Sequence, residues 1–333
     1  MDWISRITQE MTEPQNKAQG RFSSLPKRIA VAAVAIPVII LLALQGGYWF
    51  FGFVALISSF SLFEFYKLAE RKGVFPLVGT GLFFGVMVNA AFVYERLQLD
   101  VYKWLVDMGI RISMFSQLQF LLVVLVVFTL LVLLIELFRD KGSPTLNVAV
   151  TVFGVAGISL FFGTLAGIRE VFPYGFPVYK FFSSAVADEI QLSQINLWGG
   201  YTVISLLASI WICDTAAYFG GIAFGKHKLF ERVSPGKTWE GSIFGFVLAV
   251  AAMVIAQKFF LTYLALHHSI VLGVFVGVFG QIGDLVQSRF KRDAGVKDSS
   301  AIIPGHGGVY DRFDSLVFLA PIAYLYIDFV VLS

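Results

Sequence analysis

Nine long apolar runs follow one another along the chain, separated by shorter polar segments. They cover residues 27–45, 48–66, 74–94, 118–138, 147–167, 198–220, 241–261, 269–287 and 315–332. An apolar run of about 18 residues or more is long enough to cross a lipid bilayer as an α-helix. The pattern therefore predicts an all-α, polytopic integral membrane protein with about nine transmembrane helices.

The basic residues divide unequally between the alternate loops of such a topology. With the N-terminus in the cytoplasm, 19 of the 25 Lys and Arg residues fall on the cytoplasmic side. Lys and Arg collect on that side of membrane proteins. Omitting one span would reverse every later loop, so the bias supports both the count and the orientation. The polar loops 225–241 and 288–314 are then both cytoplasmic.

This arrangement divides the chain into three regions. Residues 1–26 form a cytoplasmic N-terminal segment, 27–197 an N-terminal transmembrane region, and 198–333 a C-terminal transmembrane region that we expect to be catalytic. The apolar residues of the opening MDWISRITQEM share one helical face. That pattern is typical of a helix lying on the membrane surface, and a mobile terminus is the alternative.

Composition agrees with a membrane protein. The chain is 57% hydrophobic and 14% charged, whereas a soluble domain carries about 25% charged residues. The single cysteine, Cys213, excludes an intrachain disulfide. The net charge of +3 is small, and we expect the lipid bilayer, not a nucleic acid, as the partner.

A highly charged stretch, SRFKRDAGVKDSSAIIPGHGGVYDRFDS at 288–315, separates the last two apolar runs, and nine of its 28 residues are charged. The loop GKHKLFERVSPGKTWEG at 225–241 lies on the same predicted side, so the two loops can meet. Its GKT is not a phosphate-binding P-loop, because that motif needs a Gly at position 231, which is Glu.

Two aspartates, Asp214 and Asp284, fall inside predicted spans. An aspartate at mid-membrane costs roughly 2.5–3.5 kcal/mol on insertion scales, so such residues usually face a water-filled cavity or a partner. Gln281, Asp284, Ser288 and Lys291 recur at helical spacing and form one polar stripe. A carboxylate that only bonds a neighbouring helix is the alternative, and it suits a lone aspartate better than this stripe.

Carboxylates beside clustered Lys and Arg are typical of sites that handle phosphate. Mg²⁺ takes one or two carboxylates and completes its shell with water and phosphate oxygens, while Lys and Arg neutralise the remaining phosphate charge. The glycines around His306 let backbone N–H groups approach an anion. A basic tether for anionic lipid headgroups is the alternative. It accounts for Lys291 and Arg292, but not for the DRFD segment at 311–314.

The charged stretch resembles the signature of the CDP-diacylglycerol synthases, also called phosphatidate cytidylyltransferases. That signature runs Ser, two residues, Lys-Arg, four residues, Lys-Asp, a small residue, Pro and His-Gly-Gly, and ends in Asp-Arg-any-Asp. It is filled here without a gap by Ser288, Lys291, Arg292, Lys297, Asp298, Ser300, Pro304, His306, Gly307, Gly308, Asp311, Arg312 and Asp314. The segments CDTAAYFGG, SPGKTWEG and QIGDLVQS also resemble the family, so the likeness is strong over residues 210–315.

The resemblance implies a reaction: CTP and phosphatidic acid give CDP-diacylglycerol and pyrophosphate, for phospholipid biosynthesis. It makes Asp284 and Asp311 the first choice as Mg²⁺ ligands and Asp314 and Asp214 the second, with a second metal ion also compatible. Lys291 and Arg292 join Asp284 and Asp311 as expected catalytic residues. The residues expected to bind substrate are Ser234, Lys237, Thr238, Ser288, Lys297, Asp298, His306 and Arg312.

The resemblance also implies the bacterial inner membrane and makes a homodimer the expected assembly. His306 is either a nucleotide contact or a residue of the turn. Two other classes of function stay open. A CTP-dependent kinase of a lipid alcohol would transfer the γ-phosphate, which the complete signature disfavours. An ion-coupled transporter with intramembrane carboxylates would show repeat symmetry, and the sequence shows no convincing repeat.

Overall fold

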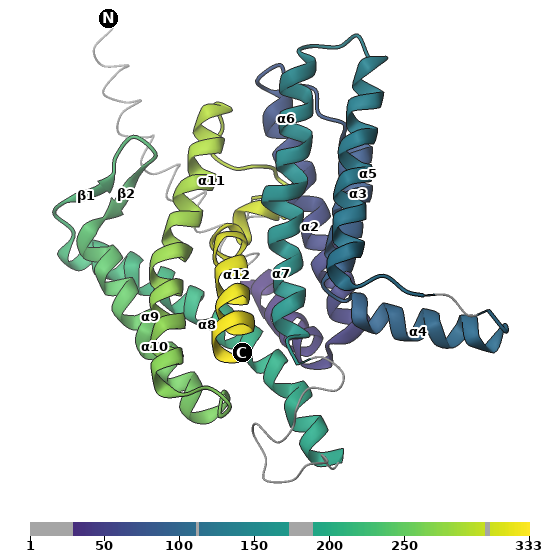
Figure 1. Cartoon of the computed structure of the whole chain (residues 1–333). Helices are drawn as coiled ribbons and strands as arrows, with labels where there is room; N and C mark the ends of the chain where they lie inside the picture. The colour runs from purple at the N-terminus through teal and green to yellow at the C-terminus, as the bar shows by residue number, and fades with distance from the viewer. Residues whose placement is uncertain (1–28, 111–112, 173–188, 304–306) are drawn as a thin grey trace, which may run out of the picture.

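A computed structural model describes residues 29–110, 113–172, 189–303 and 307–333. The described chain is a bundle of long helices, with one small hairpin of strands at its upper end (Figure 1). This confirms the predicted all-α, polytopic membrane fold. The segment 1–26, expected to be cytoplasmic, and His306 lie outside the described residues.

Seven helical segments in the described part of the chain are long and apolar enough to cross a membrane. They are α2 (Gly47–Glu70), α5 (Gln117–Leu137), α6–η1–α7 (Pro144–Gly154, Val155–Ser159, Leu160–Arg169), α8 (Glu189–Phe224), α9 (Trp239–Phe259), α10–η3–α11 (Leu266–Phe275, Val276–Gly280, Gln281–Asp293) and α12–η5 (Asp314–Tyr326, Ile327–Val331). Each corresponds to one of the predicted apolar runs.

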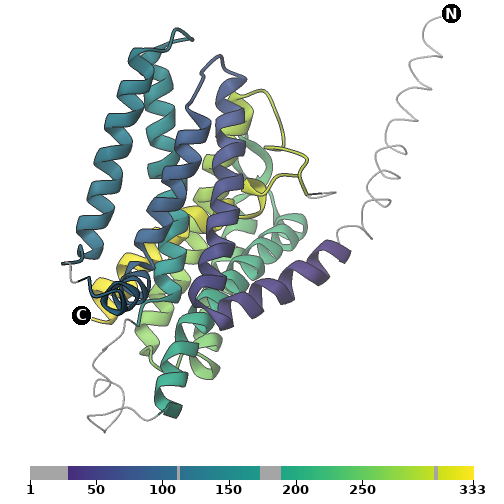
Figure 2. The same cartoon turned by 90° about the vertical axis from the view of Figure 1, so that its right-hand side faces the viewer.

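The two remaining runs look different from the expected straight spans. The run at 74–94 becomes α3 (Val78–Ala91), followed by α4 (Tyr94–Asp107) at 87° to it, and the pair counts as an eighth span if taken together. The first run becomes the shorter helix Ile29–Gln45, which is steeply inclined to α2 (Figure 2). The count of nine therefore stays a prediction.

Polar side chains explain why α4 leaves the bundle axis. Arg96 forms an ion pair with Glu170 at 2.9 Å, and the Tyr48 hydroxyl donates to Asp100 at 2.5 Å. Both contacts tie α4 to the end of the bundle where α2 begins and α7 ends. Charged residues one turn apart favour this position, where they reach water, over continuation of α3 through hydrocarbon.

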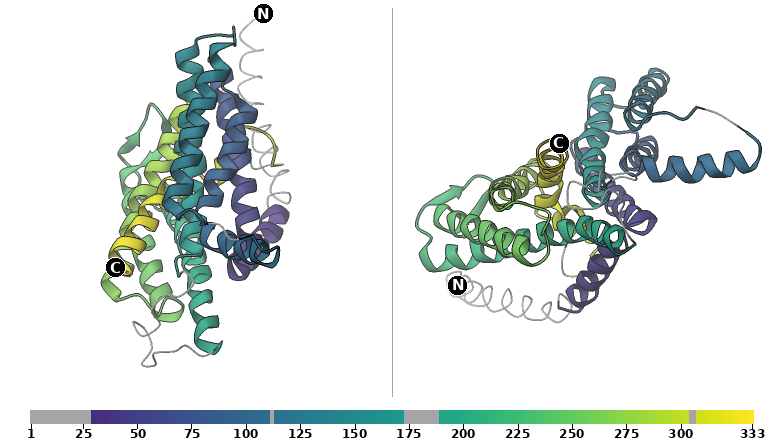
Figure 3. Two further views of the ribbon diagram at one scale, coloured as in Figure 1. Left: turned by 45° about the vertical axis from the view of Figure 1, so that its right-hand side comes forward. Right: turned by 60° about the horizontal axis from the view of Figure 1, so that its bottom comes forward.

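The polar loops gather at one end of the bundle, as the alternation of spans predicts. The ends of α2, α5 and α11 lie at the upper end in Figure 1, together with strands β1 (Lys228–Phe230) and β2 (Ser234–Thr238). Helix α4 and the C-terminus lie lower in this view, and the left view of Figure 3 shows the same division. After α11 the chain turns back alongside α2 before α12 begins (Figure 2).

Small residues let α11 approach its neighbours closely. A Cβ on Gly283 would lie 2.6 Å from the Asp314 carbonyl oxygen, and one on Gly277 would lie 2.7 Å from the Phe246 ring. Small residues at helix contacts are a general device of membrane bundles. Here they bring the helix that carries Asp284 against the beginning of the helix that carries Asp314.

Candidate functional site

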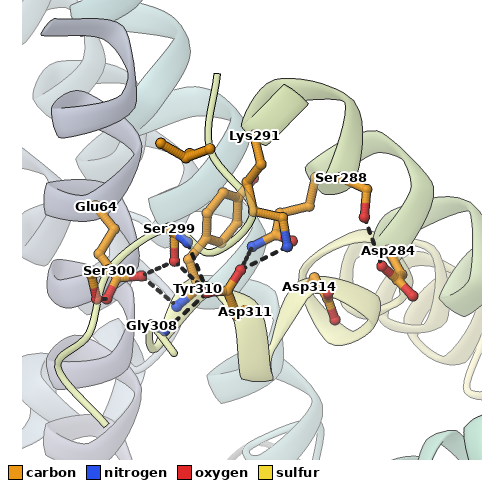
Figure 4. A network of polar contacts seen from close by, with 12 residues as sticks. Glu64, Asp284, Ser288, Lys291, Ser299, Ser300, Gly308, Tyr310, Asp311 and Asp314 are labelled. Atoms are coloured by element: carbon orange, nitrogen blue, oxygen red, sulfur yellow. Dashed lines mark hydrogen bonds and ion pairs between the residues drawn. The ribbon is translucent and has the colours of Figure 1, made fainter. Parts of the chain in front are cut away.

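Three aspartates from three different helices lie close enough for their charges to interact. We call Asp214 of α8, Asp284 of α11 and Asp314 of α12 the open acidic cluster. The charges of Asp214 and Asp284 act on Asp314, and that of Asp284 also acts on Asp214. The side chains of Asp284 and Asp314 lie near each other in Figure 4. None of the three is buried, and the Asp284 side chain keeps 30% of its surface exposed.

Within the described residues, Asp284 is the one member of this cluster with a cation in direct contact. The Lys237 ammonium lies 2.5 Å from its carboxylate, and the Ser288 hydroxyl donates to it at 3.2 Å. The charges of Lys237 and Arg312 also act on Asp214, and that of Lys291 acts on Asp314. The three carboxylates repel one another, and this repulsion favours binding of a cation between them.

Lys237 reaches the cluster from the hairpin β1–β2. The strands pair antiparallel, with Lys228 opposite Thr238. Thr238 then caps α9, because its hydroxyl accepts the Gly241 amide at 3.2 Å. Glu240, in the first turn of α9, accepts the Lys226 amide at 3.0 Å and contacts the His227 ring at 2.6 Å. The hairpin is therefore fixed to the helix at both of its ends, which holds Lys237 over the cluster.

Asp311 has a different environment, in which five donors surround one carboxylate (Figure 4). One oxygen accepts from Lys291 at 2.8 Å and Gln287 at 3.0 Å. The other accepts from the Ser299 amide and hydroxyl and the Gly308 amide, all at 2.9 Å. Burial opposes ionisation, but the bonds from Lys291, Gly308 and Ser299 outweigh it and hold the pKa of Asp311 below its ordinary value. Its side chain is 2% exposed.

The structure adds Glu64 of α2, which the sequence analysis did not single out. Glu64 is 1% exposed. Its two oxygens accept from the hydroxyls of Ser299 at 2.7 Å and Ser300 at 2.6 Å, and from the amides of Val309 and Tyr310 at 2.9 Å each. A glutamate inside an apolar run was the available signal, since it meets the same criterion that singled out Asp214 and Asp284.

Glu64 and Asp311 together form what we call the carboxylate clamp, which holds the described parts of the signature loop, residues 299–303 and 307–311. The Ser299 hydroxyl lies between the two carboxylates and can donate to either. Gly308 also sits between them, because a Cβ there would lie 2.0 Å from the Ser299 hydroxyl and 2.3 Å from Glu64. Only glycine fits this position.

The other predicted site residues lie around these two groups. Lys297, Asp298 and Arg312 are exposed, and Ser234 is half-buried. Arg292 is exposed and donates to the carbonyls of Val233 at 3.4 Å and Val296 at 3.0 Å, which joins α11 to the hairpin loop. Of these exposed cations, Arg312 acts on Asp214 of the cluster, whereas Lys291 is turned inward to Asp311.

A metal ion fits the open acidic cluster better than the clamp. Among the described residues, no three His, Cys, Asp or Glu side chains form a complete ligand set. Mg²⁺ does not need one, since it binds through one or two carboxylates and completes its shell with water and substrate phosphates. Asp214 is exposed, and Asp284 and Asp314 are half-buried. A cation at Asp311 would have to replace the donors that now occupy both of its oxygens.

Comparisons with known proteins find relatives that share about half of their length with this chain. Phosphatidate cytidylyltransferases of Staphylococcus saprophyticus and Bacillus subtilis are 39% and 40% identical over 133 and 135 residues, which is 40% of this chain and 51% and 50% of theirs. The uncharacterized protein YnbB of Escherichia coli is 38% identical over 169 residues, 50% of this chain and 56% of its own. The chain spans about half the length of the curated relatives it matches.

A family-wide comparison reaches across both transmembrane regions. The model of the cytidylyltransferase family matches residues 26–330, from before the first described helix to the last turn of η5. The match includes Glu64 and Lys237 as well as the three aspartates of the open acidic cluster. The chain therefore belongs to the cytidylyltransferase family.

Proposed function

We propose that this protein transfers the cytidylyl group of CTP to phosphatidic acid and releases pyrophosphate. The observation that carries the proposal is the open acidic cluster, rimmed by Lys237 and Arg312 at the polar end of a membrane bundle. A lipid phosphate and a nucleoside triphosphate can both reach a site at the polar end of a membrane bundle. Family membership and the relatives named phosphatidate cytidylyltransferase support it.

In this reaction an oxygen of the lipid phosphate attacks the α-phosphorus of CTP. One P–O bond forms, the bond to the β-phosphate breaks, and pyrophosphate leaves with the electron pair. Both reactants are anions, so catalysis depends on positioning and on neutralising charge. Lys237, Arg292, Lys297 and Arg312 are the cations that can meet the phosphates, and Lys237 would exchange its contact with Asp284 for one with a phosphate oxygen.

The open acidic cluster supplies the residues that would hold Mg²⁺. We assign Asp284 as the main ligand, supported by Asp314 and Asp214, with Ser288 orienting the Asp284 carboxylate. Bound there, the ion supplies positive charge between the two anionic reactants and the leaving pyrophosphate. The alternative pairing of Asp284 with Asp311 on one ion stays a prediction, and a second ion is compatible with either arrangement.

The orientation and assembly belong to the same proposal. We place the hairpin and the signature loop in the cytoplasm of a bacterial cell, facing inward from the inner membrane, because CTP is made there and because most Lys and Arg residues lie on that side. A homodimer is the expected assembly. With the loop on the cytoplasmic side, the exposed Lys297 and Arg312 would meet both CTP and anionic lipid headgroups.

A labelling experiment tests the reaction. Purified protein receives Mg²⁺, CTP labelled at either the α- or the γ-phosphate, and either phosphatidic acid or a long-chain lipid alcohol as the acceptor. We expect α-label in a CDP-lipid and γ-label in pyrophosphate, with both products lost when the metal is chelated. Transfer of γ-label to a lipid alcohol would establish the kinase alternative, and no transfer of either label would favour the transporter.

A further inference from the structure

Glu64 is the link between the N-terminal transmembrane region and the signature loop. It lies on α2, and its four hydrogen-bond donors lie 235 to 246 positions later in the sequence. All four donors belong to the two described segments of the signature loop, residues 299–303 and 307–311. We propose that Glu64 is a positioning residue for cytidylyl transfer, which sets the place of Asp311 and Arg312 through the loop.

The donor pattern supports this proposal in detail. Glu64 accepts two consecutive backbone amides, those of Val309 and Tyr310, which immediately precede Asp311 and Arg312. It also accepts hydrogen bonds from the hydroxyls of Ser299 and Ser300 in the other segment. A single carboxylate therefore holds both segments of the loop. Only a group with two acceptor oxygens and no donor satisfies all four contacts.

The carboxylate also joins the loop to the rest of the site. Ser299 contacts both Glu64 and Asp311, and Asp311 holds Lys291 on the same helix as Asp284. These contacts therefore connect α2 to α11, the helix that carries Asp284. Because Glu64 is buried and touches neither the cluster nor the exposed cations, it acts on the reaction through the loop.

The proposal rests on the proposed function for its kinetic effect but not for its structural effect. Glu64→Gln keeps the side-chain length and replaces one acceptor oxygen with a donor NH₂. That NH₂ would face a backbone amide, which cannot accept from it. Glu136→Gln is a matched control, since Glu136 is a buried acid of α5 that bonds Asn147 and Arg139 and not the signature loop.

The experiment compares the wild type with both variants in detergent or nanodiscs. Hydrogen–deuterium exchange is measured over the amides of Ser299, Gly308, Val309 and Tyr310, and kcat and KM are measured with CTP and phosphatidic acid. For Glu64→Gln we expect faster exchange of these amides and a kcat lower by at least about tenfold, because small misplacements of reacting groups are costly. KM for phosphatidic acid should change little. Glu136→Gln should leave both readouts unchanged.

A double-mutant cycle with Ser300→Ala separates positioning from a general loss of folding. If Glu64 acts through the loop, Ser300→Ala should add little to the kcat loss of Glu64→Gln, because the contact is already broken. Unchanged exchange and kcat in Glu64→Gln would overturn the proposal. Equal losses in Glu64→Gln and Glu136→Gln would also overturn it. A wild type without transferase activity would refute the proposed function, and the exchange measurement would still decide the role of Glu64.

Discussion

The two acidic groups of the polar end differ in how completely their charges are satisfied. In the carboxylate clamp, Glu64 and Asp311 are nearly inaccessible and accept four and five hydrogen-bond contacts. In the open acidic cluster, Asp284 is the one carboxylate of the described residues in direct contact with Lys237, and none of the three carboxylates is buried. A saturated carboxylate stabilises structure, whereas an under-neutralised and accessible one can bind a ligand. Aspartates of one signature thus serve different purposes.

The largest expected effect tests the cluster. Asp284→Asn keeps the shape of the side chain and removes its charge, so the protein should insert and fold normally. We expect kcat to fall by a factor of about 100 or more, the size typical of losing one strong electrostatic contact in the transition state. Raised Mg²⁺ should restore part of the activity by mass action. Asp107→Asn, on the exposed and distant α4, is the control and should leave kcat unchanged.

A similar change in the clamp should have a different signature. Asp311→Asn places a donor among five donors, so we expect loss of activity together with faster amide exchange in the signature loop. Raised Mg²⁺ should not restore it. If Mg²⁺ rescued Asp311→Asn as well as Asp284→Asn, then Asp311 would bind the metal, and the distinction between the two regions would fail.

The hydrogen bonds to Asp311 should also be insensitive to pH near neutrality. Because the folded pKa of Asp311 lies below the unfolded value, its contribution to stability is complete above the ordinary Asp pKa of about 4. It is lost as pH falls through the lower, folded pKa. Amide exchange of the loop, corrected for its intrinsic pH dependence, should therefore stay constant from pH 5 to 8, about the range of enzyme assays. Faster amide exchange of the signature loop near pH 6 would contradict a lowered pKa of Asp311.

A smaller effect is expected at the cation that bridges cluster and substrate. Lys237→Ala removes the ammonium beside Asp284 and should lower kcat/KM for CTP by about ten- to a hundredfold, the cost of one charged contact at roughly 1.4 kcal/mol per factor of ten. It also leaves the cluster more negative. Mg²⁺ should then bind more tightly in the absence of CTP, measured by calorimetry. Weaker Mg²⁺ binding would mean that Lys237 organises the cluster and does not compete with the metal.

The smallest effect concerns the rim of the site. Lys297 is exposed, and the native Cys213 is buried, so Lys297→Cys provides a single accessible thiol. We expect the variant to insert and fold normally, and its thiol to react with an impermeant reagent in inverted membrane vesicles but not in intact cells. Labelling from the outside of intact cells would reverse the proposed orientation.

The structure shows which conclusions the sequence could support. Apolar runs and alternating basic loops predicted the membrane fold and the gathering of the polar loops at one end, because both depend on local composition and on the length of each run. The spacing of Gln281, Asp284, Ser288 and Lys291 predicted their shared helix. The 87° bend between α3 and α4 was missed, because it depends on contacts of Arg96 and Asp100 with distant residues.

What only the tertiary structure decided is how the charges are partnered. The sequence alone placed Asp311 and Asp314 in one signature and Asp284 just before it, and all three are aspartates. Asp311 is closed by Lys291, Ser299 and Gly308, while Asp284 stays accessible beside Lys237. Glu64 enters the site from more than 200 residues away. Electrostatic roles follow from burial and from nearby donors, and such contacts between distant segments exist only once the helices have packed.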